Sequence, residues 1–176
     1  MRRTVERFDR GATRIELFVI LAVLFSFACF LGFNALQIKE VAASHRCMEN
    51  LKAIGRGLHL YANEEPDRSF PKDNNARGAF RKIFVRGNII DSRIFDCPSR
   101  DGHPAGKPGP FLKSPSQDLE GVEYLYSQAD MGLDSVSSGV LVVDRPGNHP
   151  GGKKFHVLHV DGRVTEETSM PSGNFA

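Results

Sequence analysis

Histidine and aspartate side chains recur near the carboxyl end of the sequence, where they could bind a metal. They are His149, His156, His159, Asp144 and Asp161. Their spacing is not that of zinc fingers or of zinc-dependent proteases. His156 and His159 stand an odd number of residues apart, so a β-strand would point their side chains to opposite faces. We therefore interpret them as histidines of a sheet and its turns, and the pattern predicts no metal site.

A serine nucleophile activated by a histidine is the other chemistry that this region would allow. Four serines lie near His149 and Asp144 in the sequence: Ser127, Ser135, Ser137 and Ser138. The G-x-S-x-G elbow, the H-E-x-x-H element and the G-x-x-x-x-G-K-[ST] phosphate loop do not occur in the sequence. Turn residues are the better interpretation of these serines. The chain is predicted not to be an enzyme, with no catalytic residue, and to require no cofactor.

Glu16 is the acid with the most unusual position, because it stands at the start of a long run without charge. The run covers residues 17–36 and reads LFVILAVLFSFACFLGFNAL. A helix rises about 1.5 Å per residue, so the run spans roughly 30 Å, the thickness of a bilayer core. A carboxylate at this boundary is unfavourable unless it has a partner. The alternative is a plain anchor whose glutamate lies among the headgroups, favoured by the helix dipole.

The segment before this run predicts its orientation. The first eleven residues contain four arginines and two acids. A basic flank stays in the cytoplasm, so the bulk of the chain is predicted to lie beyond the membrane. A removed secretory signal is the second interpretation, but such signals have a shorter apolar region that ends in small residues. The formal net charge of +2, with both signs interspersed, provides no basic face for nucleic acid.

The apolar run continues into an amphipathic segment, residues 37–63. Its apolar side chains recur at steps of three and four, the period of a helix. They are Ile38, Val41, Ala42, Met48, Leu51, Ile54, Leu58 and Tyr61. One helix is therefore predicted from about Ala12 to about Ala62, with a length of about 75 Å at the standard rise. Gly55 and Gly57 weaken such a helix, but they would allow a close contact with a sheet.

The rest of the sequence predicts short elements separated by loops. Residues 76–86 have the period of a short helix with Phe80, Ile83 and Phe84 facing inward. Residues 101–119 are rich in Gly, Pro, Ser and Lys, as exposed loops are. Strands are predicted at 122–127 and 139–144.

Asp161-Gly162 stands between two further apolar runs and predicts a hairpin with a type I′ turn. The fold class is therefore α+β: a long amino-terminal helix, half of it transmembrane, packed on a small antiparallel sheet. The helix stripe from Val41 to Tyr61 would share one core with the strands around 140–143 and 157–164.

The amino-terminal pattern resembles the prepilin motif of type IV pilins and type II secretion pseudopilins. A basic leader, Gly11, four residues, Glu16 and the apolar run follow one another as in that motif. The resemblance implies cleavage after Gly11, N-methylation of Ala12, and pairing of Glu16 with the free amine of a neighbouring subunit. Ala12 and Arg14 depart from the Phe and Leu of most members.

Three further segments resemble a large bacterial subgroup of these pilin-like proteins. The first, C-x-N-N-L-K-x-I-G-x-A-L-x-x-Y, is matched by Cys47, Asn50, Leu51, Lys52, Ile54, Gly55, Leu58 and Tyr61. The second, F-x-C-P-S, is matched by Phe95, Cys97, Pro98 and Ser99. The third is the carboxy-terminal N-H-x-G-G…V-L-x-x-D-G-x-V, matched by Asn148, His149, Gly151, Gly152, Val157, Leu158, Asp161, Gly162 and Val164.

The resemblance implies a division of the chain into a leader, an anchor and an outer domain. Residues 1–11 would be the prepilin leader, 12–36 the transmembrane and assembly helix, and 37–176 the extracytoplasmic pilin-like domain. That domain would contain the amphipathic helix 37–63 and the loops and sheet of 70–176.

Two of the three cysteines fall in the predicted outer domain. Cys47 and Cys97 would lie in an oxidising compartment, where a disulfide is permitted and would stabilise the fold by about 2–4 kcal/mol. Two separate buried thiols are the alternative, because the sequence does not give the distance between them. Cys29 lies in the apolar run and is interpreted as a small hydrophobic residue.

The predicted function is structural. The chain would be a subunit of a type IV pilus-like or type II secretion filament, held in a bacterial inner membrane with its amino terminus cytoplasmic and its outer domain periplasmic or extracellular. Its partners would be other copies and other pilin-like subunits, the prepilin peptidase and N-methyltransferase, an inner-membrane assembly platform and membrane lipid. The alternative is a single-pass anchored binding or sensor domain.

Overall fold

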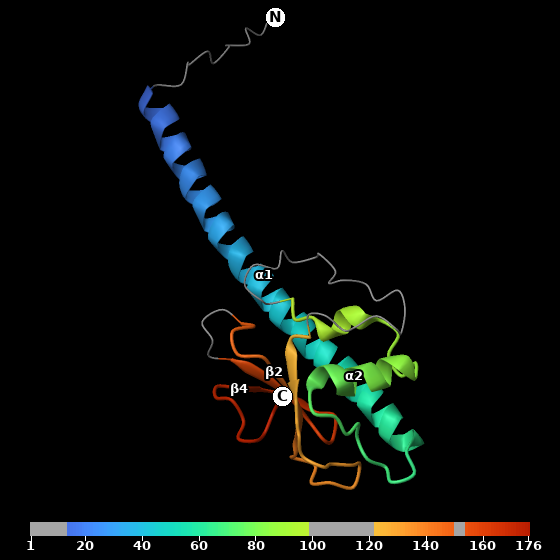
Figure 1. The fold of residues 1–176 in the computed structure, drawn as a ribbon. Coiled ribbons are helices and arrows are strands. Elements are labelled where there is room, and N and C mark those ends of the chain that lie inside the picture. The colour runs from blue at the N-terminus through green and yellow to red at the C-terminus, as the bar shows by residue number, and fades with distance from the viewer. Residues whose placement is uncertain (1–13, 99–121, 150–153) are drawn as a thin grey trace, which may run out of the picture. The chain divides into compact units, whose positions relative to one another are not determined.

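The computed structural model of the chain describes residues 14–98, 122–149 and 154–176. It divides into two compact units, Met1–Lys39 and Glu40–Ala176. One helix, α1 (Arg14–Glu64), begins in the first unit and ends in the second (Figure 1). The second unit adds a short helix and a four-stranded antiparallel sheet, so the predicted α+β fold is confirmed.

The amino-terminal part of α1 has the properties of a membrane-spanning helix. Residues 14–33 form a stretch of 20 residues that is long and apolar enough to cross a bilayer by length and composition. Each of these side chains is exposed, including large ones such as Phe18 and Phe25. A helix that is apolar on all sides and uncovered within its own unit is suited to lipid or to other apolar helices.

The carboxyl-terminal part of α1 packs into the core of the second unit. Leu51, Ile54 and Leu58 are completely buried there. The predicted stripe was too long, because Val41 is 56% exposed and the buried stripe begins at Cys47.

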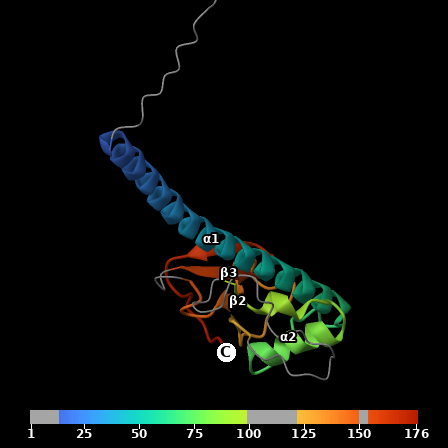
Figure 2. The same cartoon turned by 90° about the horizontal axis from the view of Figure 1, so that it is seen from above.

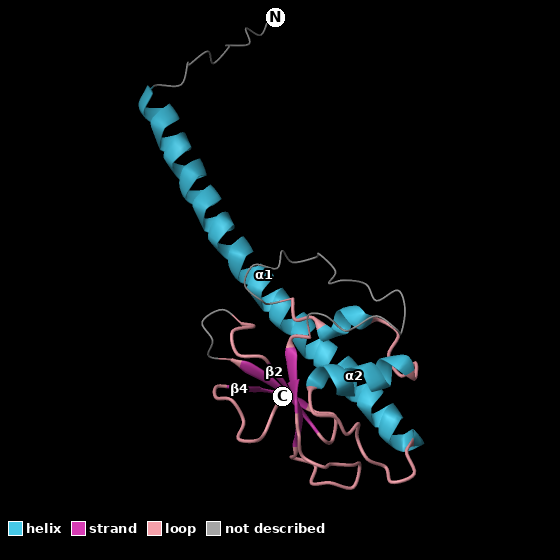
Figure 3. Ribbon diagram, viewed as in Figure 1, coloured by secondary structure: helices cyan, strands magenta, loops and turns pink. Residues whose placement is uncertain are grey.

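The sheet has the order β1-β2-β3-β4 with every neighbouring pair antiparallel. The strands are β1 (Tyr124–Tyr126), β2 (Val140–Asp144), β3 (Phe155–His159) and β4 (Val164–Glu167), drawn in magenta in Figure 3. The strands predicted at 122–127 and 139–144 are therefore confirmed.

α1 lies close to the sheet at Gly55. A Cβ atom added there would stand 2.9 Å from Leu158 Cδ1 on β3, so the predicted close contact of a glycine with the sheet is confirmed at this position. Gly57 faces Ile89 instead, where an added Cβ would stand 2.6 Å from that side chain. Figure 2 shows this part of α1 running alongside the strands.

Helix α2 (Ala76–Val85) and the 3-10 helix η1 (Ser92–Phe95) complete the core beside β1. The Asn75 side chain caps α2 by accepting a hydrogen bond from Gly78 N at 2.8 Å. Phe80 and Ile83 are buried, as predicted for this helix. Phe80 stacks on Phe95 with ring centroids 5.0 Å apart and meets Tyr126 edge-on at 5.9 Å.

The hairpin at Asp161-Gly162 forms, but the predicted turn type was wrong. A type I′ turn needs a positive φ at both central residues. Gly162 has a φ of 81°, whereas Asp161 has no positive φ. Gly162 N donates to His159 O, and His159 N donates to Arg163 O, so three residues lie between this hydrogen-bonded pair. Val160 is buried in the core but belongs to the loop. A loop of this length needs only one residue with a positive φ after its turn, and Gly162 is that residue.

The two edges of the sheet are occupied differently. The carboxyl-terminal segment lies along β1, where Tyr126 N donates to Ala176 O at 3.0 Å and Gln128 N donates to Asn174 O at 2.8 Å. At the other edge, β4 carries Glu166 and Glu167.

Phe80→Ala is expected to destabilise the second unit by about 3–5 kcal/mol, because it leaves a large cavity beside Phe95 and Tyr126. The chain contains no tryptophan, so urea unfolding can be followed by the fluorescence of its tyrosines, all three of which are buried in this unit. Ile90→Ala is the matched control: its side chain is 89% exposed, and its truncation should cost at most about 0.5 kcal/mol. Equal midpoints for the two variants would refute the assigned core position of Phe80.

Candidate functional site

The structure describes only part of the predicted assembly motif. Gly11 and Ala12 lie outside the described residues. Glu16 lies in the first turn of α1, and its side chain is exposed. A carboxylate in the first turn interacts favourably with the positive end of the helix dipole. Glu16 is thus at the start of the apolar stretch, as the motif requires.

The second group of polar residues is a completely buried carboxylate and its donors. Asp144 ends β2, where an apolar strand run places its side chain inside the unit. Its Oδ2 atom lies 2.6 Å from His149 Nε2, 2.8 Å from His156 Nδ1 and 3.0 Å from the backbone nitrogen of His156. Its Oδ1 atom accepts a hydrogen bond from Cys47 Sγ at 3.1 Å. Four donors therefore converge on one carboxylate.

Two cysteines stand beside this carboxylate. Cys47 comes from the middle of α1, and Cys97 follows η1; both are buried free thiols. One ligand atom each of Cys47, Cys97, Asp144 and His149 lies within 4.8 Å of the others, and we call these four residues the Cys-His-Asp cluster. Of the two alternatives left by the sequence, the structure contains the pair of buried thiols, close to each other.

The surroundings of the cluster give Asp144 and Cys47 different charges at neutral pH. Burial raises the pKa of the Asp144 carboxyl, but hydrogen bonds from His149, His156 and Cys47 outweigh it and lower the pKa to about 2. Burial raises the pKa of the Cys47 thiol, and Cys97 and Asp144 raise it further. The carboxylate is therefore charged at neutral pH and the Cys47 sulfur keeps its proton when no cation is bound.

A further layer of side chains holds the cluster in place. His156 Nε2 lies 3.2 Å from Ser44 Oγ on α1, which fixes the plane of the His156 ring. The rings of His149 and His156 meet edge to face with centroids 4.5 Å apart. The hydroxyl of Tyr124 on β1 lies 3.3 Å from Cys47 Sγ. Burial raises the Tyr124 pKa well above its ordinary value, so this hydroxyl keeps its proton at neutral pH.

Ser44, His156 and Asp144 have the connectivity of a catalytic triad, but not its surroundings. In such a triad, backbone N–H groups next to the serine stabilise the oxyanion. Ser44 lies within α1, where backbone N–H groups are already bonded along the helix. The serines considered from the sequence do not join this group: Ser127 Oγ and Ser135 Oγ accept hydrogen bonds from the backbone of their own turns.

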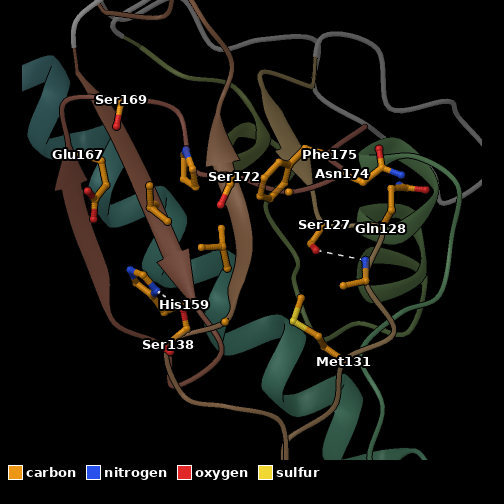
Figure 4. A pocket seen from close by; sticks show the side chains of 16 residues that line it. Ser127, Gln128, Met131, Ser138, His159, Glu167, Ser169, Ser172, Asn174 and Phe175 are labelled. Atoms are coloured by element: carbon orange, nitrogen blue, oxygen red, sulfur yellow. Dashed lines mark hydrogen bonds between the residues drawn. The ribbon is translucent and has the colours of Figure 1, made fainter.

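A separate cavity of about 590 Å³ lies over the other face of the sheet. Val140 and Val157 form part of its floor, together with Phe175 from the carboxyl-terminal segment. His159 and Glu167 are among its polar side chains, as Figure 4 shows. His159 Nε2 lies 2.8 Å from Thr165 Oγ1, so this histidine is already engaged by the sheet.

The residues of the carboxy-terminal motif lie in different parts of the structure. His149 belongs to the Cys-His-Asp cluster, whereas Asp161 and Gly162 form the hairpin turn. Gly151 and Gly152 lie outside the described residues. Sequence reasoning missed the convergence of His149 and His156 on Asp144. A signal was present in the run GVLVVD, where an acid ends a strand that is otherwise apolar.

Comparisons with known proteins add no assignment. The chain matches no protein-family model, no curated protein and no solved structure. Its function is therefore inferred from its own residues.

Proposed function

We propose that this chain is a structural subunit of a pilin-like filament, of the type IV pilus or type II secretion kind. The observation that carries the proposal is the exposure of α1 from Arg14 to Phe33 in a helix whose later turns form the spine of a folded unit. Such a helix needs two successive surroundings: lipid before assembly, and the helices of other copies afterwards. Both are apolar, so the transfer has a small cost.

Glu16 gives this assembly its register. Apolar helices in lipid gain little from contact with one another, so polar groups decide how they associate. A carboxylate at Glu16 and the α-amine of Ala12 on a neighbouring copy would attract strongly in a low-dielectric bundle, and each would offset the other's loss of water. The amine exists only after cleavage behind Gly11, which links assembly to processing.

The proposed cellular location follows from the amino-terminal segment. The arginine-rich flank would remain in the cytoplasm of a bacterial inner membrane, and the second unit would lie on the periplasmic side. The partners would be other pilin-like subunits, the prepilin peptidase and N-methyltransferase, and the assembly platform in the membrane.

The experiment that tests the proposal is mass spectrometry of the intact protein extracted from membranes that contain the peptidase. The expected amino terminus is Ala12 carrying a methyl group. Membranes without the peptidase provide the control, in which the leader should be retained. A chain that keeps Met1 or its leader in both membranes would overturn the proposal.

A membrane-anchored binding domain is the second candidate, favoured by the cavity over the sheet (Figure 4). Its floor is apolar and its rim carries His159 and Glu167, a combination found in sites for small ligands. The two candidates differ in their products: the binding domain would remain unprocessed and monomeric in the membrane.

A further inference from the structure

We propose that Cys47, Cys97, Asp144 and His149 bind one Zn²⁺ ion that fastens α1 to the sheet. The four residues lie in the second unit, and their ligand atoms are within 4.8 Å of one another. All four are buried. The inference is independent of the filament proposal, because it concerns only the interior of this unit.

The donor set fits zinc better than other common cations. Two sulfurs, one imidazole nitrogen and one carboxylate oxygen are the ligand types of tetrahedral zinc sites. Calcium and magnesium would require six or more oxygen ligands or several waters, and this cluster is buried and offers one carboxylate. Four protein ligands leave no open position, so the ion would be structural rather than catalytic.

The surrounding residues have the arrangement that supports metal ligands. His156 contacts the Asp144 carboxylate through both its ring and its backbone nitrogen. The Tyr124 hydroxyl lies beside Cys47 Sγ, where it can donate to a thiolate. Such outer contacts orient the ligands and strengthen metal binding.

Binding replaces hydrogen bonds that exist without the ion. Zn²⁺ would displace the proton of Cys47, which now points to Asp144 Oδ1, and the proton of Cys97. Both protons leave to solvent, and each thiolate forms a bond to the metal. The contact of His149 Nε2 with Asp144 Oδ2 would likewise give way, so that both groups turn to the ion.

The position of the ligands in the sequence defines what the ion would hold. Cys47 lies on α1, Cys97 follows η1, Asp144 ends β2 and His149 follows β2. The ligands thus come from three segments that are far apart along the chain. The ion would hold these segments together at the point where the buried stripe of α1 begins.

The test is the metal content and thiol count of the full chain, purified in detergent without chelators. We expect elemental mass spectrometry to find about one zinc ion per chain. After denaturation with a chelator, all three cysteines of the chain should react as thiols. Replacement of zinc by Co²⁺ should produce the thiolate-to-cobalt absorption of a tetrahedral site.

Matched variants separate ligands from neighbours. Cys97→Ser and His149→Ala are expected to lower the bound zinc at least about 10-fold, while His156→Ala weakens zinc affinity by about 10- to 100-fold. Cys29→Ser and His45→Ala are the controls, because both residues are exposed on α1, and they should keep the full zinc content.

Three results would overturn the inference. The wild-type chain could lack zinc and be lighter by the mass of two hydrogens, with a disulfide bond linking the peptides that contain Cys47 and Cys97. It could lack zinc, keep three thiols and fail to take up added Zn²⁺ or Co²⁺. Finally, Cys97→Ser and His149→Ala could both retain the zinc of the wild type. These results concern the interior alone and leave the test of amino-terminal cleavage unaffected.

Discussion

Replacing Gly11 by valine is expected to leave the chain with its leader and to lower the amount of cleaved protein by about 100-fold. A peptidase must hold the backbone closely at the bond that it cuts, and glycine is the residue without a Cβ atom to obstruct that approach. Discrimination between side chains in such a pocket reaches about 10- to 200-fold for a single carbon. The measurement is the ratio of the two intact masses in membranes that contain the peptidase.

Gly32→Val is the matched control for this experiment. It makes the same change within α1, where an added Cβ would meet nothing within 4 Å. This variant should be cleaved as well as the wild type. Normal cleavage of Gly11→Val would show that Gly11 is not the residue before the cut.

Glu16→Gln is expected to reduce incorporation into filaments by about 100-fold or more, while insertion and cleavage continue. The amide keeps the shape of the side chain but removes its charge. The ammonium of the neighbouring Ala12 would then remain uncompensated in a bundle of low dielectric constant, and breaking such a buried pair costs about 3–5 kcal/mol. The readout is the fraction of the protein in sheared filaments relative to the fraction in the membrane.

Glu49→Gln provides the control for the change of charge. Glu49 is an exposed acid on the same helix, beyond the membrane-spanning stretch. Its replacement should leave incorporation unchanged. If Glu16→Gln assembles as well as Glu49→Gln, the carboxylate of Glu16 does not set the register of the filament.

The elements of this fold that could be predicted from the sequence are those governed by local periodicity. The long helix follows from apolar residues at steps of three and four, and the strands from short apolar runs and the Asp-Gly hairpin signal. Gly55 could be assigned to a close contact because glycine destabilises a helix, and a close approach of another element accounts for its presence there. The extent of the buried stripe could not be predicted, because it depends on which turns of α1 the rest of the second unit covers.

The buried cluster shows what local patterns leave out. Cys47 and Cys97 were recognised as a pair, and His149 as part of a motif, but nothing in their spacing brings them to Asp144. Their meeting depends on the packing of α1 against β2 and on the path that follows η1. The helical face of Cys47 and the strand face of Asp144 could each be predicted; the contact between them is tertiary.

The edges of the sheet have a consequence if the chain assembles as proposed. Crowded copies of a sheet with an open apolar edge can exchange strands and grow into aggregates. Here the segment ending in Ala176 fills one edge, and the acids Glu166 and Glu167 line the other. In the proposed filament, helices could then pack densely while the covered β1 edge hinders pairing of strands between copies.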